Sequence, residues 1–271
     1  MISIMLLIIF SPRLLRAEHE SAPDQVIFNV SARGPLKSPE ISSRPYLLYN
    51  ETTYLPQINN AVNEGKLIYQ AQDWNSLRPY LGVALGQDLR SDSTLIFNDN
   101  HVSPLLGIRY APRALPYGFY LEFREKMRVV RAPQTRSFSE GDLRAGAYLY
   151  QWFNLAQIYS DSRLFQEIYA ETLYTSALQN NIFIQGWLKQ GVRNKLHKIL
   201  DLDAYIEFAG TYDRTPLPDY HIAYLDLGAR ANFRLDSFLA QIIFKKPLAW
   251  MMTPQTLNFP WSTQLVISGE F

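Results

Sequence analysis

Few residues in this sequence are of types that could carry out chemistry. It contains four histidines and no cysteine, and it has no glycine-rich phosphate loop and no HExxH metal motif. Without cysteine, disulfide bonds, thiolate metal sites and a cysteine nucleophile are excluded. Two histidines follow an aspartate by two residues, His101 after Asp99 and His221 after Asp219. An imidazole close to a carboxylate can act as a general acid–base pair, so a hydrolase would use these residues. Solvated side chains are the simpler interpretation, and we expect no catalytic residue, metal or cofactor.

Composition narrows the function classes further. The chain has 26 Lys and Arg against 25 Asp and Glu, and this balance argues against nucleic acid as a partner. With 47% hydrophobic, 14% aromatic and 19% charged residues, the chain has the composition of a folded protein rather than a disordered one. Its longest apolar run, residues 4–10, is far shorter than the roughly 18 residues of a membrane-spanning helix. Any crossing of a membrane would therefore require strands.

A period of two dominates the sequence from about residue 77 onwards. In residues 223–235, for example, alanine, leucine and phenylalanine alternate with tyrosine, aspartate, glycine, arginine and asparagine. Such alternation is typical of β-strands with one apolar and one polar face. The pattern predicts an all-β fold, an antiparallel up-and-down barrel of ten strands, or twelve if residues 25–32 and 66–72 pair in. The ten segments are residues 77–90, 106–110, 117–129, 142–153, 167–174, 182–192, 200–208, 223–235, 239–245 and 264–271.

The distribution of glycine and charge indicates which face points outward. Most strand glycines share the face that carries arginine and glutamate, while the opposite face is nearly free of charge. Lipid outside and a crowded polar lumen inside explain this, as in a transmembrane barrel. The expected outer connections, such as residues 91–100 and 247–261, are long, and the inner ones are mostly shorter, with residues 154–163 as an exception. A soluble barrel that buries the apolar face and binds a lipid is the alternative.

The polar face would place many charged side chains in the lumen, basic on the third and fourth segments and acidic on the fifth and seventh. One interpretation is a cross-lumen network of ion pairs that holds a narrow barrel shut, since buried charges must be paired. The other is a small pore that selects solutes by charge. The predicted lumen residues are Arg78, Arg90, Arg109, Glu122, Arg124, Lys126, Arg128, Arg144, Glu167, Glu171, Lys189, Arg193, Asp201, Asp203, Glu207, Asp226, Arg230 and Arg234.

The N-terminal part has a different character. Residues 2–10 are apolar and the chain becomes polar after Ala17, which predicts a secretory signal peptide over residues 1–17. Residues 18–75 are rich in Pro, Ser and Asn, and we interpret them as a periplasmic linker or plug with a short helix starting near Pro56. The barrel domain would then comprise residues 76–271.

The last residues of the chain carry a resemblance to a known class. Residues 265–271 alternate and end in Phe271, and with the ten segments they resemble Gram-negative outer-membrane β-barrel proteins. The resemblance implies an outer-membrane location, contact with membrane lipid and lipopolysaccharide, and recognition of Phe271 by the barrel-assembly machinery. More narrowly, residues 77–81 and 140–146 resemble the C-terminal barrels of phage-adsorption protein A and exopolysaccharide exporters. Residues 18–75 are too few for the helical repeats that precede those barrels.

The last outer loop carries large apolar side chains where water is expected. They would rest on the membrane interface, fold into the barrel mouth as a lid, or form a docking patch. The sequence thus predicts a structural or narrow-pore envelope protein whose surface loops are available to phage or envelope partners. Alternatives are a soluble or periplasmic lipid-binding barrel and an outer-membrane hydrolase with a His/Asp site at the rim. The loop residues concerned are Trp250, Met251, Met252, Phe259 and Trp261.

Overall fold

The computed structural model describes residues 45–55, 60–72, 74–88, 100–112, 115–129, 139–177, 180–214, 222–250 and 261–270. These residues form twelve β-strands. No helix in this part of the chain is long and apolar enough to cross a membrane. The strands are β1 (Tyr46–Leu55), β2 (Asn60–Gln70), β3 (Leu77–Asp88), β4 (His101–Tyr110), β5 (Tyr117–Arg128), β6 (Ser139–Tyr159), β7 (Ser162–Thr175), β8 (Asn181–His197), β9 (Leu200–Asp213), β10 (Ile222–Leu235), β11 (Phe238–Trp250) and β12 (Ser262–Glu270).

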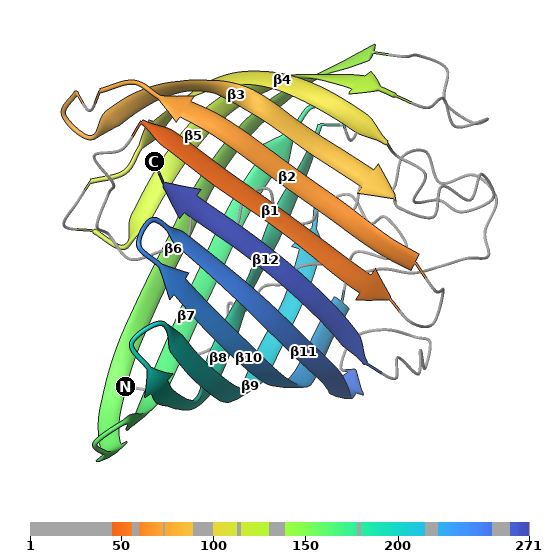
Figure 1. The fold of residues 1–271 in the computed structure, drawn as a ribbon. Helices are drawn as coiled ribbons and strands as arrows, with labels where there is room; N and C mark the ends of the chain where they lie inside the picture. Colours follow the sequence, from red (N-terminus) through yellow and green to blue (C-terminus); the bar gives the residue numbers. More distant parts are fainter. Residues whose placement is uncertain are drawn as a thin grey trace, which may run out of the picture.

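The strands close into a single antiparallel barrel (Figure 1). Each strand pairs with its neighbours in sequence, and β1 pairs with β12 from Leu47 opposite Glu270 to Tyr54 opposite Thr263. This confirms the antiparallel up-and-down barrel and the count of twelve strands. The predicted strand at residues 66–72 corresponds to the second half of β2, and the other additional strand is β1. The ten segments found from alternation correspond to β3 through β12.

The two additional strands correct the expected domain boundary. β1 and β2 lie in the barrel wall, so the barrel begins at Tyr46 and not near residue 76. Residues 46–55 and 60–70 are therefore neither linker nor plug, and residues 60–62 belong to a strand rather than to a helix. The alternation was missed because polar Asn50 and Asn63 stand on the face that is apolar in the other strands. The expected signal peptide and the predicted strand at residues 25–32 lie outside the described residues.

The two ends of the barrel differ. At one end the connections are tight turns: Asn75 and Ser76 have positive φ angles of 51° and 69° between β2 and β3, and two residues each separate β6 from β7, β8 from β9 and β10 from β11. The expected long connection at residues 154–163 is wrong, because β6 and β7 continue until only two residues separate them. We call this end the turn end and the opposite one the loop end.

Alternation along the strands sorts the side chains into two environments. Large apolar side chains point outward and are exposed, as with Leu106 at 62%. Charged side chains point inward and are buried, as with Glu122 at 1%. This is the reverse of the arrangement that a soluble barrel requires, since water-soluble barrels place the apolar face inside. The outward apolar surface is therefore suited to contact with lipid.

Candidate functional site

The barrel interior gathers most of the charged side chains that the sequence assigned to a lumen. Arg234 belongs to this set but lies half in solvent near the turn end. The side chains of Arg90 and Arg128 lie outside the described residues. Buried or half-buried on the inward face are Arg78, Arg109, Glu122, Arg124, Lys126, Arg144, Glu167, Glu171, Lys189, Arg193, Asp201, Asp203, Glu207, Asp226 and Arg230.

Asp203 on β9 is the centre of the densest ion-pair group. Its Oδ1 accepts a hydrogen bond from Nε of Arg193 at 2.7 Å, and its Oδ2 accepts one from Nε of Arg230 at 2.8 Å. Asn232 on β10 donates a third bond to Oδ2 at 2.9 Å. The carboxylate is 3% exposed, so both guanidiniums depend on it for charge neutralisation in a dry environment.

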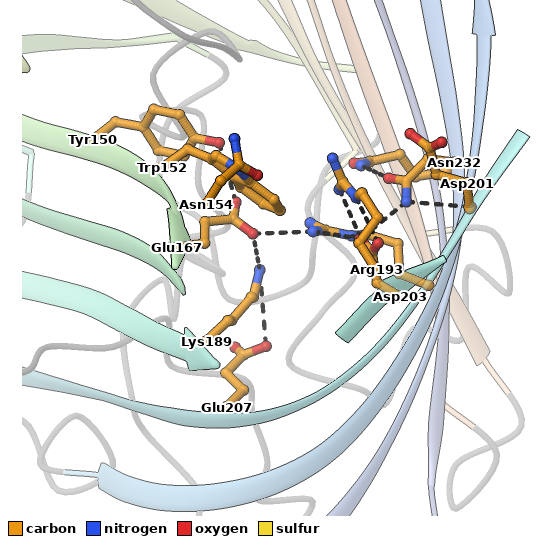
Figure 2. A network of polar contacts seen from close by, with 12 residues as sticks. Tyr150, Trp152, Asn154, Glu167, Lys189, Arg193, Asp201, Asp203, Glu207 and Asn232 are labelled. Atoms are coloured by element: carbon orange, nitrogen blue, oxygen red, sulfur yellow. Dashed lines mark hydrogen bonds and ion pairs between the residues drawn. The ribbon is translucent and has the colours of Figure 1, made fainter. Parts of the chain in front are cut away.

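A second row of charges extends this group along the inner faces of β7 to β11. Arg230 on β10 also reaches Glu167 on β7 at 3.1 Å, although β8 and β9 lie between these strands. Lys189 lies between Glu167 and Glu207, at 4.0 and 3.9 Å, and Lys245 on β11 donates to Glu207 at 2.7 Å. Figure 2 shows Glu167, Lys189 and Glu207 in a chain, with a further dashed line running from Glu167 toward the group around Asp203.

Aromatic rings pack against these charges. Trp152 stacks on Phe165 with ring centroids 4.6 Å apart and an interplanar angle of 8°, and the guanidinium of Arg193 lies 4.2 Å from the Trp152 ring. Tyr205 packs edge-on against Phe165. Its ring fills the space beside Gly228, where a Cβ atom would stand 2.3 Å from two ring carbons. The glycine is thus needed for the ring to lie flat on the wall.

One apolar cluster lines the inner face along half of the ring. Tyr49 on β1, Phe165 on β7 and Tyr205 on β9 are buried in the same cluster as Ile243 and Val266. β1 and β7 are six strands apart in a ring of twelve, so they lie on opposite walls. Buried side chains from β1, β12, β11, β9 and β7 therefore form one apolar layer along the inside of the barrel.

A separate ion-pair group lies on the wall formed by β2 to β5. Glu122 accepts a hydrogen bond from Lys66 at 2.7 Å and one from the hydroxyl of Tyr80 at 2.9 Å, and it pairs with Arg124 on its own strand. Lys66 belongs to β2, so its side chain passes β3 and β4 to reach β5. Sequence reasoning missed Lys66 because its segment was assigned to a linker. It also missed Lys245, although that residue shares the inward face of its segment.

Glu171 has an environment of a different kind. Its carboxylate accepts hydrogen bonds from the hydroxyls of Tyr120 at 2.7 Å and Tyr169 at 2.9 Å and from the side-chain amide of Gln185 at 2.6 Å. These donors come from β5, β7 and β8. Neutral donors satisfy this buried carboxyl, and they tie three strands together without an ion pair.

The interior charges are segregated by wall. On the inward faces of β2 to β6, the buried and half-buried charged residues whose side chains are described comprise six cations and three anions. On β7 to β10 the same count gives three cations and six anions. The first set is Lys66, Arg78, Arg109, Arg124, Lys126 and Arg144 with Glu64, Glu122 and Asp142; the second is Lys189, Arg193 and Arg230 with Glu167, Glu171, Asp201, Asp203, Glu207 and Asp226. A basic wall therefore faces an acidic one, as the sequence predicted for segments three, four, five and seven.

The remaining candidates from the sequence are a metal site, the rim histidines, the C-terminal Phe271 and the last loop. Within the described residues, no three His, Asp or Glu side chains are close enough to hold a metal ion. His101 begins β4 at the loop end, whereas Asp99, Asp219, His221 and the C-terminal Phe271 lie outside the described residues. The same holds for Met251, Met252, Phe259 and the side chain of Trp250.

Trp261 is exposed and packs on Tyr54 with ring centroids 6.1 Å apart, on the outward face at the loop end. Of the loop residues, Trp261 thus stands where a membrane interface would lie.

Comparisons with known proteins give structural similarity alone. No protein-family model matches the sequence, and a search of curated proteins found no match. Solved structures of outer-membrane β-barrels are similar to this chain. The β domain of the Bordetella autotransporter BrkA has 13% identity and a TM-score of 0.44, covering 83% of this chain and 98% of that one. The KdgM porin has 7% identity and a TM-score of 0.38, with 83% and 99% covered. OmpT of Vibrio cholerae has 8% identity and a TM-score of 0.33, with 83% and 96% covered. Values this low support no inference about activity, solute or partner.

Proposed function

We propose that this protein is a structural β-barrel of the Gram-negative outer membrane whose lumen is closed to solutes by its own side chains. The observation that carries the proposal is the burial of the inward charges together with the apolar cluster that lines the inner face from β1 round to β7. Charged residues along a water-filled channel would keep part of their surface in solvent, yet Glu122 and Glu171 are 1% and 2% exposed. The inward charges stabilise the barrel by pairing with one another, and the surface loops remain available to phage or envelope partners.

The membrane assignment is supported by the outward face. It is apolar, and aromatic side chains cluster near both of its ends, with Tyr46 against Tyr69 at the turn end and Tyr54 against Trp261 at the loop end. Such aromatic girdles stand at the two interfaces of membrane barrels. Fractionation of cell envelopes tests the location, and a detergent gel of boiled and unboiled samples tests the closed barrel. Recovery in the soluble periplasm without a mobility shift would contradict both.

Conductance across a planar bilayer tests whether the lumen is closed. We expect the unmodified protein to show no stepwise conductance. Removing the Glu167–Arg230 pair in the double variant Glu167→Ala/Arg230→Ala should produce steps, because this pair projects into the lumen and joins β7 to β10 over two intervening strands. Arg234→Ala is the matched control, since Arg234 pairs with Asp201 at the rim and is 48% exposed. Porin-like conductance by the unmodified protein would refute the closed lumen.

A narrow pore for small charged solutes is the second candidate, and the segregation of charge between the two walls favours it. Opposed basic and acidic walls in a constriction select solutes by charge. If the unmodified barrel conducts, the double variant Arg124→Glu/Lys126→Glu should weaken or reverse its ion preference, since both side chains belong to the basic wall. Unchanged selectivity in a conducting channel would show that the pathway does not pass these residues.

A further inference from the structure

A polar cluster interrupts the outward face of β1 and β2. Asn63 donates hydrogen bonds to Oδ1 of Asn50 at 3.0 Å and to the hydroxyl of Thr52 at 2.8 Å, and Asn50 donates back to Oδ1 of Asn63 at 3.3 Å. Gly65, opposite Asn50 in the register, leaves room for the Asn50 amide, which lies 3.1 Å from where a Cβ atom would stand. We call Asn50, Thr52 and Asn63 the amide cluster.

The amide cluster lies between the two aromatic girdles. On β1 the outward positions run from Tyr46 through Leu48, Asn50 and Thr52 to Tyr54. Tyr46 stands at the turn end and Tyr54 at the loop end, each beside another outward ring. Because girdles mark the two interfaces of a membrane barrel, the polar side chains between them would face hydrocarbon. This placement rests on the proposed outer-membrane location.

Hydrocarbon supplies no hydrogen-bond partners, so an amide or hydroxyl that faces it keeps unsatisfied hydrogen-bond donors or acceptors. Asn50 uses one of its two amide hydrogens on Asn63, and Thr52 accepts a bond but donates none to any residue that the structure describes. The amide cluster therefore presents free donors beside carbonyl oxygens that still have a free lone pair. A surface with free donors next to free acceptors is complementary to itself under a two-fold rotation.

We propose that the amide cluster is the centre of a lateral interface with a second copy of this chain. In the dimer, β1 and β2 of each copy face each other within the membrane, and the spare donors of one amide cluster meet the acceptors of the other. The second copy is favoured over an unrelated barrel because the cluster supplies both halves of the hydrogen-bond pattern. Polar side chains act in the same way between membrane helices, where they hydrogen-bond across the interface.

Cysteine crosslinking can test the dimer, because the chain contains no cysteine and only an introduced thiol can form a disulfide. Thr52→Cys places one thiol in the amide cluster. Thr172→Cys is the matched control: it is the same substitution on the outward, exposed face of β7, six strands away from β1. Outer membranes carrying either variant are oxidised, boiled in detergent and separated without reductant. We expect a band at twice the chain mass, several-fold stronger for Thr52→Cys than for Thr172→Cys.

A third variant links the crosslink to the amides. Adding Asn50→Leu and Asn63→Leu to Thr52→Cys removes the hydrogen bonds while keeping an apolar outward face, so the dimer band should fall to the level of the control. Each variant is also run unboiled to show that its barrel is closed. Equal crosslinking of Thr52→Cys and Thr172→Cys in heat-modifiable, membrane-embedded barrels overturns the dimer and leaves the proposed function intact. Absence from the membrane fraction overturns both.

Discussion

Removing the carboxylate of Asp203 should destabilise the barrel more than removing that of Asp201 on the same strand. In Asp203→Asn, Arg193 and Arg230 lose the anion that bonds both of them, and Arg193 is only 17% exposed. Leaving a buried charge without its partner costs about 3–5 kcal/mol. Arg230 keeps its contact with Glu167 at 3.1 Å, so we expect the loss to lie toward the lower end of that range. Three kcal/mol would lower the folded-to-unfolded ratio by a factor of about 10².

Asp201→Asn provides the matched control, since it is the same substitution two residues earlier on the same strand face. Asp201 pairs with Arg234 at 3.1 Å, but Arg234 is 48% exposed. Pairs with this much exposure contribute about 0–1 kcal/mol. Both variants would be folded into detergent micelles or lipid vesicles across a urea series. Tryptophan fluorescence and the mobility of the unboiled band give the folded fraction.

Compensation separates the loss of a counter-ion from a general loss of packing. Adding Arg193→Met to Asp203→Asn removes a charge that has lost its carboxylate and keeps a long apolar side chain over Trp152. We expect the double variant to regain part of the lost stability. Equal destabilisation by Asp203→Asn and Asp201→Asn would refute the argument, because it would mean that burial of the pair has no energetic consequence. A double variant less stable than Asp203→Asn alone would contradict the counter-ion explanation.

Three further predictions concern packing and assembly. Gly228→Ala should destabilise the barrel by about 1–3 kcal/mol in the same urea series, because the new methyl group would meet the Tyr205 ring. Gly141→Ala is the control and should be nearly neutral, because the atoms nearest to its new methyl group would stand at 3.4 Å or more. Phe165→Ala should cost about 3–5 kcal/mol, since this ring is fully buried in an apolar cluster with residues of β1, β9, β11 and β12; a loss below that of Gly228→Ala would contradict this packing. Deleting Phe271 should lower the amount of barrel in the outer membrane of cells without changing refolding in detergent, and normal assembly would argue against its role as an assembly signal.

The sequence by itself determined the strands whose outward face is uniformly apolar. In β10, small and apolar residues alternate with Asp226, Arg230 and other polar residues, and a side-chain period of two assigns both faces without any knowledge of neighbours. The same rule placed Glu122, Asp203 and Arg230 inside before any contact was known. It failed for β1 and for the first half of β2, because Asn50 and Asn63 interrupt the apolar face and the alternation no longer stands out.

Only the tertiary structure decided which charges meet. Lys66 pairs with Glu122 over two intervening strands, and Arg230 reaches Glu167 in the same way. These partners depend on barrel closure and on the register of every strand between them, and no local pattern encodes those quantities. Closure likewise places Tyr49 and Phe165, 116 positions apart in the sequence, in one apolar cluster, because β1 pairs with β12. Alternation fixes which face a side chain takes, and closure of the ring fixes what it touches.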